Sequence, residues 1–288
     1  MTAEPAPSSG FSDVTISPAD YEFVRLLLRK EIGFDLGNDR QYLVVNRLLP
    51  IAAQFNCPDI GQLIERIRQT QDRLFLQAVV ESMTINETSF FRGGQKLFDN
   101  LAQVVIPALQ RARASQRRLR IWSGACATGQ EPYTILITLL EQCPQLRDWT
   151  IELVATDISE RALEQARNGT YNQFEIQRGL PIQMLLKYFT KTGDRWQMTE
   201  SLRHRVTFLR HNLLDSFLRL APPLDIVFLR NVLIYFETTT KTELFQRLKQ
   251  SLATDGILVL GETESTLGIT TDFQLHAACR EFYQPASR

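Results

Sequence analysis

The chain has 288 residues, of which 44% are hydrophobic and 22% are charged, and its 32 basic and 32 acidic residues give a formal net charge of +0. The length suits one large domain, or a medium domain with a small one. A neutral chain has no overall attraction to nucleic acid or to an anionic membrane. Because the sequence has no apolar run long enough to span a bilayer and no secretion signal, we expect a cytoplasmic protein without membrane insertion.

The cysteines give no sign of a metal site or of a disulfide framework. No two of them form a C-x-x-C pair, and none groups with histidine at metal-ligand spacing. We therefore expect free thiols and no bound metal. The cysteines are Cys57, Cys126, Cys143 and Cys279.

The first part of the chain predicts a tail followed by a helical domain. Residues 1–14 are rich in Pro, Ala, Ser and Gly and are expected to be a disordered tail. Ser17 before Pro18 predicts a helix start, and Gly33 predicts its end. Apolar residues keep helical spacing, so further helices are expected over about 39–55, 60–69 and 71–83. We predict an all-helical domain over residues 15–83.

Residues 84–118 predict a linker and a helix. The segment 84–92 is irregular and polar-aromatic, and a helix is expected over about 94–114. Basic residues gather where this helix ends. A nucleic-acid patch is one interpretation, but a solvated helix end is favoured because cations stabilise a helix C-terminus and no aromatic residues lie among them. These residues are Arg111, Arg113, Arg117, Arg118 and Arg120.

From residue 119 to 288, strand-like runs alternate with helical ones, which is typical of an α/β domain with a mainly parallel sheet. The expected strands are 119–123, 151–156, 206–209, 225–229 and 256–260, and the expected helices are 131–142, 159–168 and 238–252. The alternation lapses over 169–205, where a helix at 181–189 and a strand near 195–199 predict an inserted subdomain. A terminal hairpin is expected over 273–283.

The first candidate site is the turn of small residues between Ile121 and Tyr133. Such residues let the backbone approach a ligand, and a helix N-terminus follows at once. The turn has neither G-x-G-x-x-G nor G-K-[ST], so the dinucleotide fingerprint and the P-loop are excluded. A tight turn without a ligand remains an alternative.

Two carboxylates near this turn indicate the kind of ligand. Asp157 ends an apolar strand, where an acidic side chain can accept both ribose hydroxyls of an adenosine, although it could also cap the next helix. Glu131 stands where a phosphate site would need a basic residue. Its charge would repel a phosphate and attract an ammonium group. The pair favours S-adenosylmethionine over a nucleotide.

Two further segments are candidates. Leu229–Phe236 follows a strand, which would place Arg230, Asn231 and Tyr235 at the carboxyl edge of the sheet. An ordinary capped strand end is the alternative. Asn86–Arg92 has two adjacent phenylalanines between polar residues and an arginine. The alternative there is a linker that packs its phenylalanines onto the sheet domain.

Together these segments resemble the bacterial chemotaxis-receptor methyltransferases, the CheR family, in order and spacing over about residues 17–284. The resemblance implies a Rossmann-like class I methyltransferase domain, a small N-terminal all-helical domain that recognises the substrate, and a β-subdomain inserted at 169–205. It implies S-adenosylmethionine as the methyl donor, S-adenosylhomocysteine as the product, and no metal. The motifs are Asn86–Arg92, Gly129–Tyr133, Ala155–Ile158 and Arg230–Phe236.

The resemblance also assigns roles on the donor side of the site. It implies that Asn86, Thr88 and Arg92 lie over the cofactor and the reacting carboxylate, with Arg92 as a catalytic residue that orients the substrate. It implies that Glu131 holds the methionine end of the cofactor and that Asp157 binds the ribose.

Further roles fall on the later strands. The resemblance implies that Asn212 and Leu213 approach the adenine. It also implies that Arg230 and Asn231 contact the cofactor at the sheet edge, and that Tyr235 is a catalytic residue beside the donor methyl.

The implied reaction is methyl transfer to glutamate side chains in the cytoplasmic helical domain of chemoreceptors, carried out by a monomer. The family turn usually has Ser where Ala127 stands, and often Glu where Gln130 stands, so some cofactor contacts could differ. The insertion is a few residues shorter than in members that bind a receptor-tail peptide, so no such tether is expected.

Other functions stay open or are disfavoured. A non-catalytic S-adenosylmethionine-binding adaptor is one alternative, and a methyltransferase of nucleic acids or small molecules is another. The neutral charge and the lack of an Asn-Pro-Pro-Tyr motif disfavour nucleic acid. A nicotinamide-dependent dehydrogenase fails on the spacing of the turn and on Glu131.

Overall fold

The computed structural model describes residues 15–70, 72–277 and 279–286. The tail expected over residues 1–14 lies outside these ranges. The chain forms two compact units, Met1–Thr84 and Ile85–Arg288. Each unit is described here by itself.

The smaller unit is helical. Its helices are α1 (Pro18–Ile32), α2 (Gln41–Gln54), α3 (Ile60–Thr70) and α4 (Arg73–Met83). The Ser17 hydroxyl accepts the backbone N–H of Asp20 at 3.1 Å, and Gly33 ends α1 in the left-handed region at φ 70°. The predicted bounds of this helix are therefore confirmed. Leu28 and Leu48 are fully buried and anchor the core of the unit.

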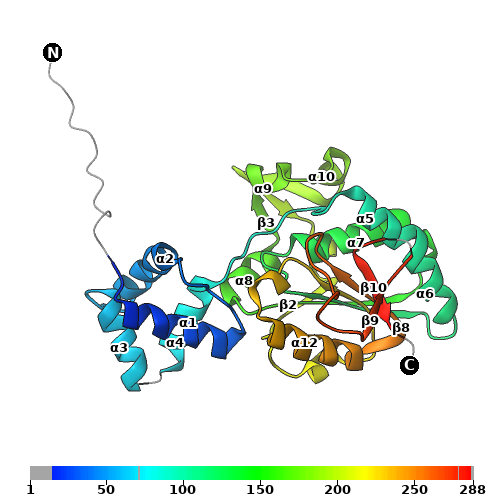
Figure 1. The fold of residues 1–288 in the computed structure, drawn as a ribbon. Coiled ribbons are helices and arrows are strands. Elements are labelled where there is room, and N and C mark those ends of the chain that lie inside the picture. Colours follow the sequence, from blue (N-terminus) through cyan, green and yellow to red (C-terminus); the bar gives the residue numbers. More distant parts are fainter. Residues whose placement is uncertain (1–14, 71, 278, 287–288) are drawn as a thin grey trace, which may run out of the picture. The chain divides into compact units, whose positions relative to one another are not determined.

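The larger unit is built on a seven-stranded sheet with the order β6-β2-β1-β7-β8-β10-β9. Figure 1 labels four of these strands, β2, β8, β9 and β10. The five strands from β6 to β8 in this order are parallel, as predicted. The predicted hairpin of β9 and β10 is confirmed, and β10 also pairs antiparallel with β8. The strands are β1 (Arg118–Gly124), β2 (Thr150–Asp157), β6 (Val206–Arg210), β7 (Leu224–Leu229), β8 (Leu252–Leu260), β9 (Phe273–Leu275) and β10 (Phe282–Pro285).

Helices cover both faces of this sheet because successive strand residues point to opposite sides. Ile226 and Phe228 of β7 belong to the apolar cluster that contains α7 (Gln130–Gln142). Val227 belongs to the cluster that contains α12 (Thr238–Ser251), on the other face. Figure 1 shows α12 and α7 on opposite sides of the strands. The helix that follows β2 is α8 (Glu160–Asn168), on the α7 side.

The helix expected over about 94–114 is broken by a π-helical turn. It forms as α5 (Gln95–Asn100), the turn η1 (Leu101–Val105) and α6 (Ile106–Ala112). Pro107 has no backbone N–H to donate, so the regular bonding pattern cannot continue through it. The N–H of Ile106 instead bonds to the carbonyl of Leu101, five residues back, which widens the helix by one residue.

The basic run at the end of α6 is only partly the solvated helix end that was expected: Arg111 and Arg117 are exposed, but other members of the run pair with carboxylates. The Arg113 side chain is only 15% exposed and lies 2.8 Å from Asp225 and 2.5 Å from Asp255. Arg120 lies 3.0 Å from Glu152. These carboxylates come from β7, β8 and β2, so the arginines tie the end of α6 and the start of β1 to the neighbouring strands. Sequence spacing gave no sign of such distant partners.

The segment 169–205 forms a small antiparallel sheet with the order β3-β5-β4. The expected helix and strand are present, whereas β3 and β4 were not predicted because each is only three or four residues long. Tyr171 in β3 donates its hydroxyl to the Thr128 carbonyl at 2.8 Å, which fixes the segment to the turn after β1. The elements are β3 (Thr170–Asn172), α9 (Gln173–Gln177), α10 (Ile182–Tyr188), β4 (Phe189–Thr192), β5 (Arg195–Met198) and α11 (Glu200–Arg203).

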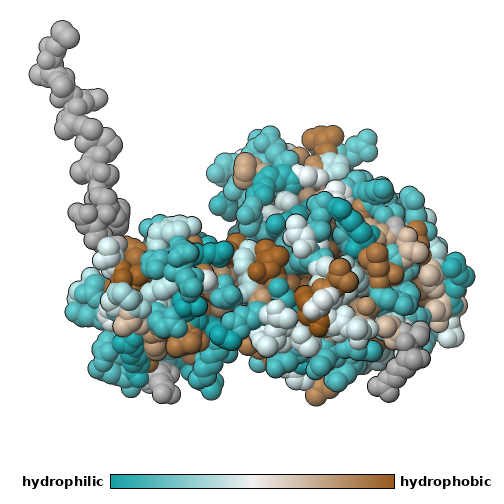
Figure 2. Space-filling view, in the orientation of Figure 1, coloured by the Kyte–Doolittle hydropathy of each residue, from teal (hydrophilic) through white to brown (hydrophobic). Residues whose placement is uncertain are grey.

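The visible surface of the larger unit is mostly hydrophilic, with apolar residues in small separate groups (Figure 2). Its largest apolar side chains are instead buried in the two clusters on either face of the sheet. Within the described ranges, no helix combines the length and the apolar character that crossing a bilayer requires. The four cysteines are free thiols, as expected.

Candidate active site

The turn between β1 and α7 has an unusual backbone. Ala125 and Ala127 lie in the left-handed region at φ 53° and 48°, and Gly129 has φ 91°. A Cβ on Gly129 would lie 2.8 Å from the Cβ of Ala166 in α8, so this position admits only glycine. Alanine rarely adopts such angles, and strained backbone of this kind gathers at ligand sites. The turn at the carboxyl edge of the sheet is therefore a candidate ligand site.

Asp157 ends β2 directly beside this turn. Its side chain is buried, and one carboxylate oxygen accepts the N–H of Ala127 at 2.8 Å. The other oxygen accepts the N–H of Ser159 at 2.9 Å. The Asp157 carbonyl accepts the N–H of His211 at 3.0 Å, which brings the end of β6 to the same place.

Asn212 and Leu213 follow β6 at this edge. Asn212 is half-buried and accepts the N–H of Leu214 at 3.0 Å, while Leu213 is buried in the cluster around α12. His211, which sequence analysis did not single out, packs its ring against Phe217 with a centroid distance of 5.7 Å. Burial lowers the pKa of this histidine, and its Nε2 has no hydrogen-bond partner among the described residues. A neutral imidazole therefore lies beneath the edge.

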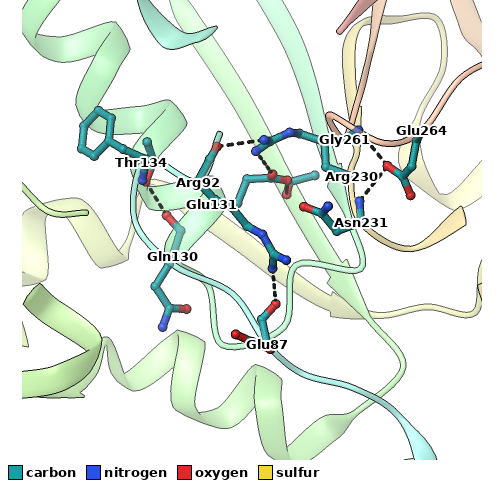
Figure 3. A network of polar contacts seen from close by, with 11 residues as sticks. Glu87, Arg92, Gln130, Glu131, Thr134, Arg230, Asn231, Gly261 and Glu264 are labelled. Carbon is teal, nitrogen blue, oxygen red and sulfur yellow. Dashed lines mark hydrogen bonds and ion pairs between the residues drawn. The ribbon is translucent and has the colours of Figure 1, made fainter. Parts of the chain in front are cut away.

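Glu131 lies in the first turn of α7, where the positive end of the helix dipole favours a carboxylate. Its side chain is 11% exposed. One oxygen accepts the Ser123 hydroxyl at 2.9 Å, and the other lies 2.9 Å from Nη1 of Arg230 (Figure 3). Two partners from β1 and from the end of β7 therefore fix the orientation of this carboxylate.

Arg230 joins three segments that are distant in sequence. Its guanidinium is buried, and Nη2 donates to the Arg92 carbonyl at 2.8 Å while Nη1 holds Glu131 (Figure 3). A Cβ on Gly93 would lie 2.5 Å from Nη2 of Arg230. The main chain after Arg92 can therefore approach the guanidinium closely only because residue 93 is glycine. Arg230 thus follows β7 at the predicted edge of the sheet, and its guanidinium is buried there as a bridge.

The Asn86–Arg92 segment lies across α7. Phe91 is buried and donates its N–H to the Thr134 hydroxyl at 3.1 Å. The Arg92 side chain is half-buried and donates to the Glu87 carbonyl at 2.6 Å. Asn86 is exposed and Thr88 is half-buried. This segment packs its aromatic pair inward, as the linker alternative required, and also reaches the Arg230 bridge.

Arg178 of the inserted segment also reaches this region. It lies 2.7 Å from the Glu87 carboxylate, and its hydrogen bond and charge hold the pKa of Glu87 below its ordinary value. A Cβ on Gly179 would lie 2.1 Å from the Phe90 carbonyl oxygen. The two segments therefore touch through their main chains. Sequence analysis had not connected them.

Asn231 follows Arg230 in the left-handed region at φ 58°, and its N–H donates to Glu264 at 2.7 Å. Glu264 was also missed by sequence analysis. The available signal was its position just after the strand expected over 256–260, since the carboxyl ends of parallel strands share one edge. Tyr235, in the 3₁₀ turn η4 (Leu233–Tyr235), is half-buried against the cluster around α12.

The chemistry of this edge is acidic and oxygen-rich. Glu131 and Asp157 both contact the segment from Ser123 to Ala127, and residues 124–131 include no lysine or arginine. Burial and the nearby Asp157 raise the pKa of Cys126, so its thiol stays protonated. Within the described chain, no group of three or more His, Cys, Asp and Glu is placed to hold a metal ion. These carboxylate acceptors suit a ligand with hydroxyls and a positive charge.

Comparison with known proteins assigns both units to one kind of enzyme. Residues 19–84 match the model of the "CheR methyltransferase, all-alpha domain", and residues 86–282 match that of the "CheR methyltransferase, SAM binding domain".

Individual relatives agree over most of their length. The "Chemotaxis protein methyltransferase 1" of Pseudomonas aeruginosa is 39% identical over 262 residues, which cover 89% of this chain and 94% of the relative. The "Chemotaxis protein methyltransferase Cher2" of Pseudomonas putida is 38% identical over 261 residues, covering 89% and 94%. The "Chemotaxis protein methyltransferase" of Salmonella typhimurium is 31% identical over 267 residues, covering 91% and 89%.

Proposed function

The chain belongs to the CheR methyltransferase family, and we propose that it transfers methyl groups from S-adenosylmethionine to glutamate side chains of chemoreceptors, forming methyl esters. S-adenosylmethionine-dependent methyl transfer in chemotaxis follows from the family itself. The glutamate acceptor and the receptor substrate are the proposed part. The observation that carries the proposal is the convergence of Glu131 and Asp157 on one turn without a basic residue.

The residues of this edge fit the donor molecule. Asp157 would accept the ribose hydroxyls, since its carboxylate already contacts the turn and ends β2. Glu131 would hold the ammonium group of the methionine end, fixed in place by Ser123 and Arg230. Asn212 and Leu213 would contact the adenine from the end of β6. The left-handed backbone at Ala125 and Ala127 would let the main chain lie close to the ligand.

Arg230 and Asn231 would support the residues that contact the donor directly. Because the guanidinium of Arg230 is buried against Glu131, its contribution to cofactor binding would pass through that carboxylate. Asn231 would complete the edge beside it. Asn86 and Thr88, at the start of the segment that leads to Arg92, would cover the bound donor.

When bound, S-adenosylmethionine supplies an electrophilic methyl group on a sulfonium sulfur. A substrate glutamate has a reference pKa of about 4.3, so at neutral pH it is already the nucleophile and no general base is needed. Its oxygen forms the new bond to carbon as the carbon–sulfur bond breaks, and the electron pair of that bond stays on sulfur. The protein has to align these atoms and exclude water.

Arg92 is the proposed catalytic residue for orienting the substrate carboxylate, and Tyr235 the one that shapes the space beside the donor methyl. The reaction turns an anion and a cation into two neutral groups. Tight stabilisation of the substrate anion would therefore slow the step. The Arg92 guanidinium is shared with the Glu87 carbonyl, which suits a residue that positions the anion more than it stabilises it.

The substrate is proposed to be the cytoplasmic helical domain of a chemoreceptor, recognised by the N-terminal helical unit of a monomeric, cytoplasmic enzyme. We also propose that no receptor-tail tether is needed. A titration of the purified protein with a receptor-tail pentapeptide should give no measurable heat, and tight specific binding would contradict this part of the proposal.

Two measurements test the main proposal. Calorimetric titration with S-adenosylhomocysteine should show binding at one site, and its absence would reject the assigned cofactor site. Purified receptor domain incubated with enzyme and methyl-labelled S-adenosylmethionine should gain label that alkali releases as methanol, because only an ester is cleaved that way. Label that resists alkali would place the methyl group on another kind of atom, and excess S-adenosylhomocysteine is the inhibition control.

A further inference from the structure

Glu264 makes an unusual set of contacts near the site and belongs to none of the motifs that indicate the function. Its side chain is buried in the loop after β8. One carboxylate oxygen accepts the N–H groups of Asn231 and Gly261, each at 2.7 Å. The other accepts those of Val232 and Leu233, at 2.9 and 2.8 Å. Figure 3 shows this carboxylate on the far side of Asn231 from Arg230.

These bonds determine the path of the chain after β7. Three successive N–H groups, those of residues 231–233, point at one carboxylate, and buried N–H groups without a partner are costly. Asn231 is left-handed at φ 58°, a conformation that asparagine adopts more readily than most non-glycine residues. Glu264 stabilises this turn, since its oxygens accept the N–H groups of residues 231–233 together.

The fit around the carboxylate is close. A Cβ on Gly261 would lie 2.6 Å from the nearer oxygen of Glu264 and 2.9 Å from the side-chain nitrogen of Asn231. Even a methyl group on Gly261 has no room between the loop after β8 and the turn at Asn231. Displacement of the Glu264 carboxylate would therefore move the Asn231 backbone directly.

The turn that Glu264 holds begins one residue after the Arg230 bridge. Arg230 is 2.9 Å from Glu131 and 2.8 Å from the Arg92 carbonyl, so its backbone has to be correctly placed to reach both. A chain of direct contacts thus runs from Glu264 through the 231–233 backbone to Arg230, and from there to Glu131.

We propose that Glu264 is a positioning residue for the methyl-transfer site, setting the backbone from which Arg230 orients Glu131 toward the methyl donor. The proposal rests on the proposed function for the identity of the donor. Glu264 does not itself touch the reacting atoms. It acts through the main chain of residues 231–233. Its replacement should weaken donor binding although every residue proposed to contact the donor is unchanged.

The test compares E264Q with E262Q. The side-chain amide introduced by E264Q would turn an NH₂ group toward two backbone N–H donors, so at least two of the four bonds would be lost. Glu262 lies two residues earlier in the same loop, but its side chain is 63% exposed and pairs with Arg280, which makes it the matched control.

Affinity for S-adenosylhomocysteine is the deciding readout. E264Q should bind it about tenfold more weakly or worse, the factor expected when hydrogen bonds to a charged acceptor are lost, while E262Q should stay within about twofold of the parent. An E264Q protein that is folded and binds as tightly as E262Q would reduce Glu264 to a purely structural residue and overturn the proposal. If E264Q does not fold, E264D, which is one methylene too short to reach all four donors, takes its place.

A second readout needs no cofactor. Amide hydrogen exchange over residues 229–236 of the free protein should rise in E264Q and stay unchanged in E262Q. If the parent protein fails to bind S-adenosylhomocysteine, the proposed function falls, and this exchange experiment still decides whether Glu264 holds the loop. Unchanged exchange in E264Q would overturn the positioning role whatever the outcome for the cofactor.

Discussion

The guanidinium of Arg230 and the carboxylate of Glu131 lie 2.9 Å apart, although 99 residues separate them in the chain. Their side chains are 2% and 11% exposed, so the pair is almost entirely removed from water. Because a buried charge is costly without its partner, each residue depends on the other. The carboxylate that we assign to the methionine end of the donor is thus held by a residue from the end of another strand.

Replacing Arg230 by methionine should destabilise the protein strongly. Glu131 would keep its buried charge and lose its partner, which typically costs about 3–5 kcal/mol of unfolding free energy. Urea unfolding would measure this. R178M is the control, because Arg178 and Glu87 form an exposed pair with side chains 40% and 59% exposed, and such pairs contribute about 1 kcal/mol or less. Equal losses of unfolding free energy in the two variants would contradict the claim that the buried pair contributes more than the exposed one.

Asp157→Asn should weaken donor binding. The amide keeps the size of the side chain but has one acceptor oxygen instead of two, and it loses the charge that strengthens bonds from hydroxyls. We expect the Kd for S-adenosylhomocysteine to rise by about tenfold or more in calorimetry. Asp194→Asn, in the exposed turn between β4 and β5, should leave the Kd unchanged. An unaltered affinity in D157N would remove Asp157 from the ribose site.

Arg92→Ala should lower kcat and leave the Kd for S-adenosylhomocysteine within about tenfold, or 1.4 kcal/mol. The contact from Arg230 reaches the main-chain carbonyl of Arg92, so alanine removes the guanidinium without removing that bond. Turnover on receptor domain and calorimetry would be measured in parallel. Lys96→Ala, an exposed neighbour, should behave like the parent enzyme. A normal kcat in R92A would refute the orienting role.

The stability of the protein should fall at low pH partly through Asp255. The hydrogen bond from Arg113 lowers the pKa of this carboxyl in the folded chain. A lowered folded pKa means that the contribution is fully present above the unfolded value of about 3.9 and is lost as pH falls through the folded value. The stability difference between the parent and D255N should therefore shrink as the pH falls below about 4. Urea midpoints across this range measure it, and a difference that grows on acidification would contradict the assignment.

Gly179→Ala should be more damaging than Gly193→Ala. Both glycines are left-handed, at φ 100° and 62°, so alanine is strained at each. Only at Gly179 would the new Cβ meet another atom, the Phe90 carbonyl oxygen at 2.1 Å, whereas nothing lies within 4 Å at Gly193. We expect G193A to cost about 1 kcal/mol and G179A clearly more in urea unfolding. Similar losses of unfolding free energy in G179A and G193A would mean that the chain around Gly179 separates easily from the chain around Phe90.

Local patterns were enough to predict the main elements of the fold. Ser17 and Gly33 mark the ends of the first helix through contacts within a few residues. The parallel strands could be predicted because strand-like runs alternate with helical runs. The π-helical turn before Pro107 was not predicted, because apolar spacing does not record the loss of one hydrogen-bond donor. The strands β3 and β4, of three and four residues, were not predicted.

Strand ends alone predict only part of how the candidate site residues are placed. Asp157 and Glu131 could be placed on one edge because they follow adjacent strands of a parallel sheet. The burial of Arg230 could not, since it depends on the Arg92 carbonyl and on the missing side chain of Gly93. Glu264 was not predicted either. All four of its partners are main-chain groups, which every sequence has, and only its position after the strand expected over 256–260 pointed to this edge.

The position of β10 affects the order in which the chain can assemble during synthesis. Among the described residues Phe282–Pro285 is the last strand in the chain, yet it lies between β8 and β9. While the ribosome still holds this segment, the apolar edge of β8 at Leu258 and Val259 has no neighbour on that side, and such an edge can pair with another nascent chain. Residues 282–285 must therefore leave the ribosome before β10 can cover this edge, and until then the edge of β8 stays open to other chains.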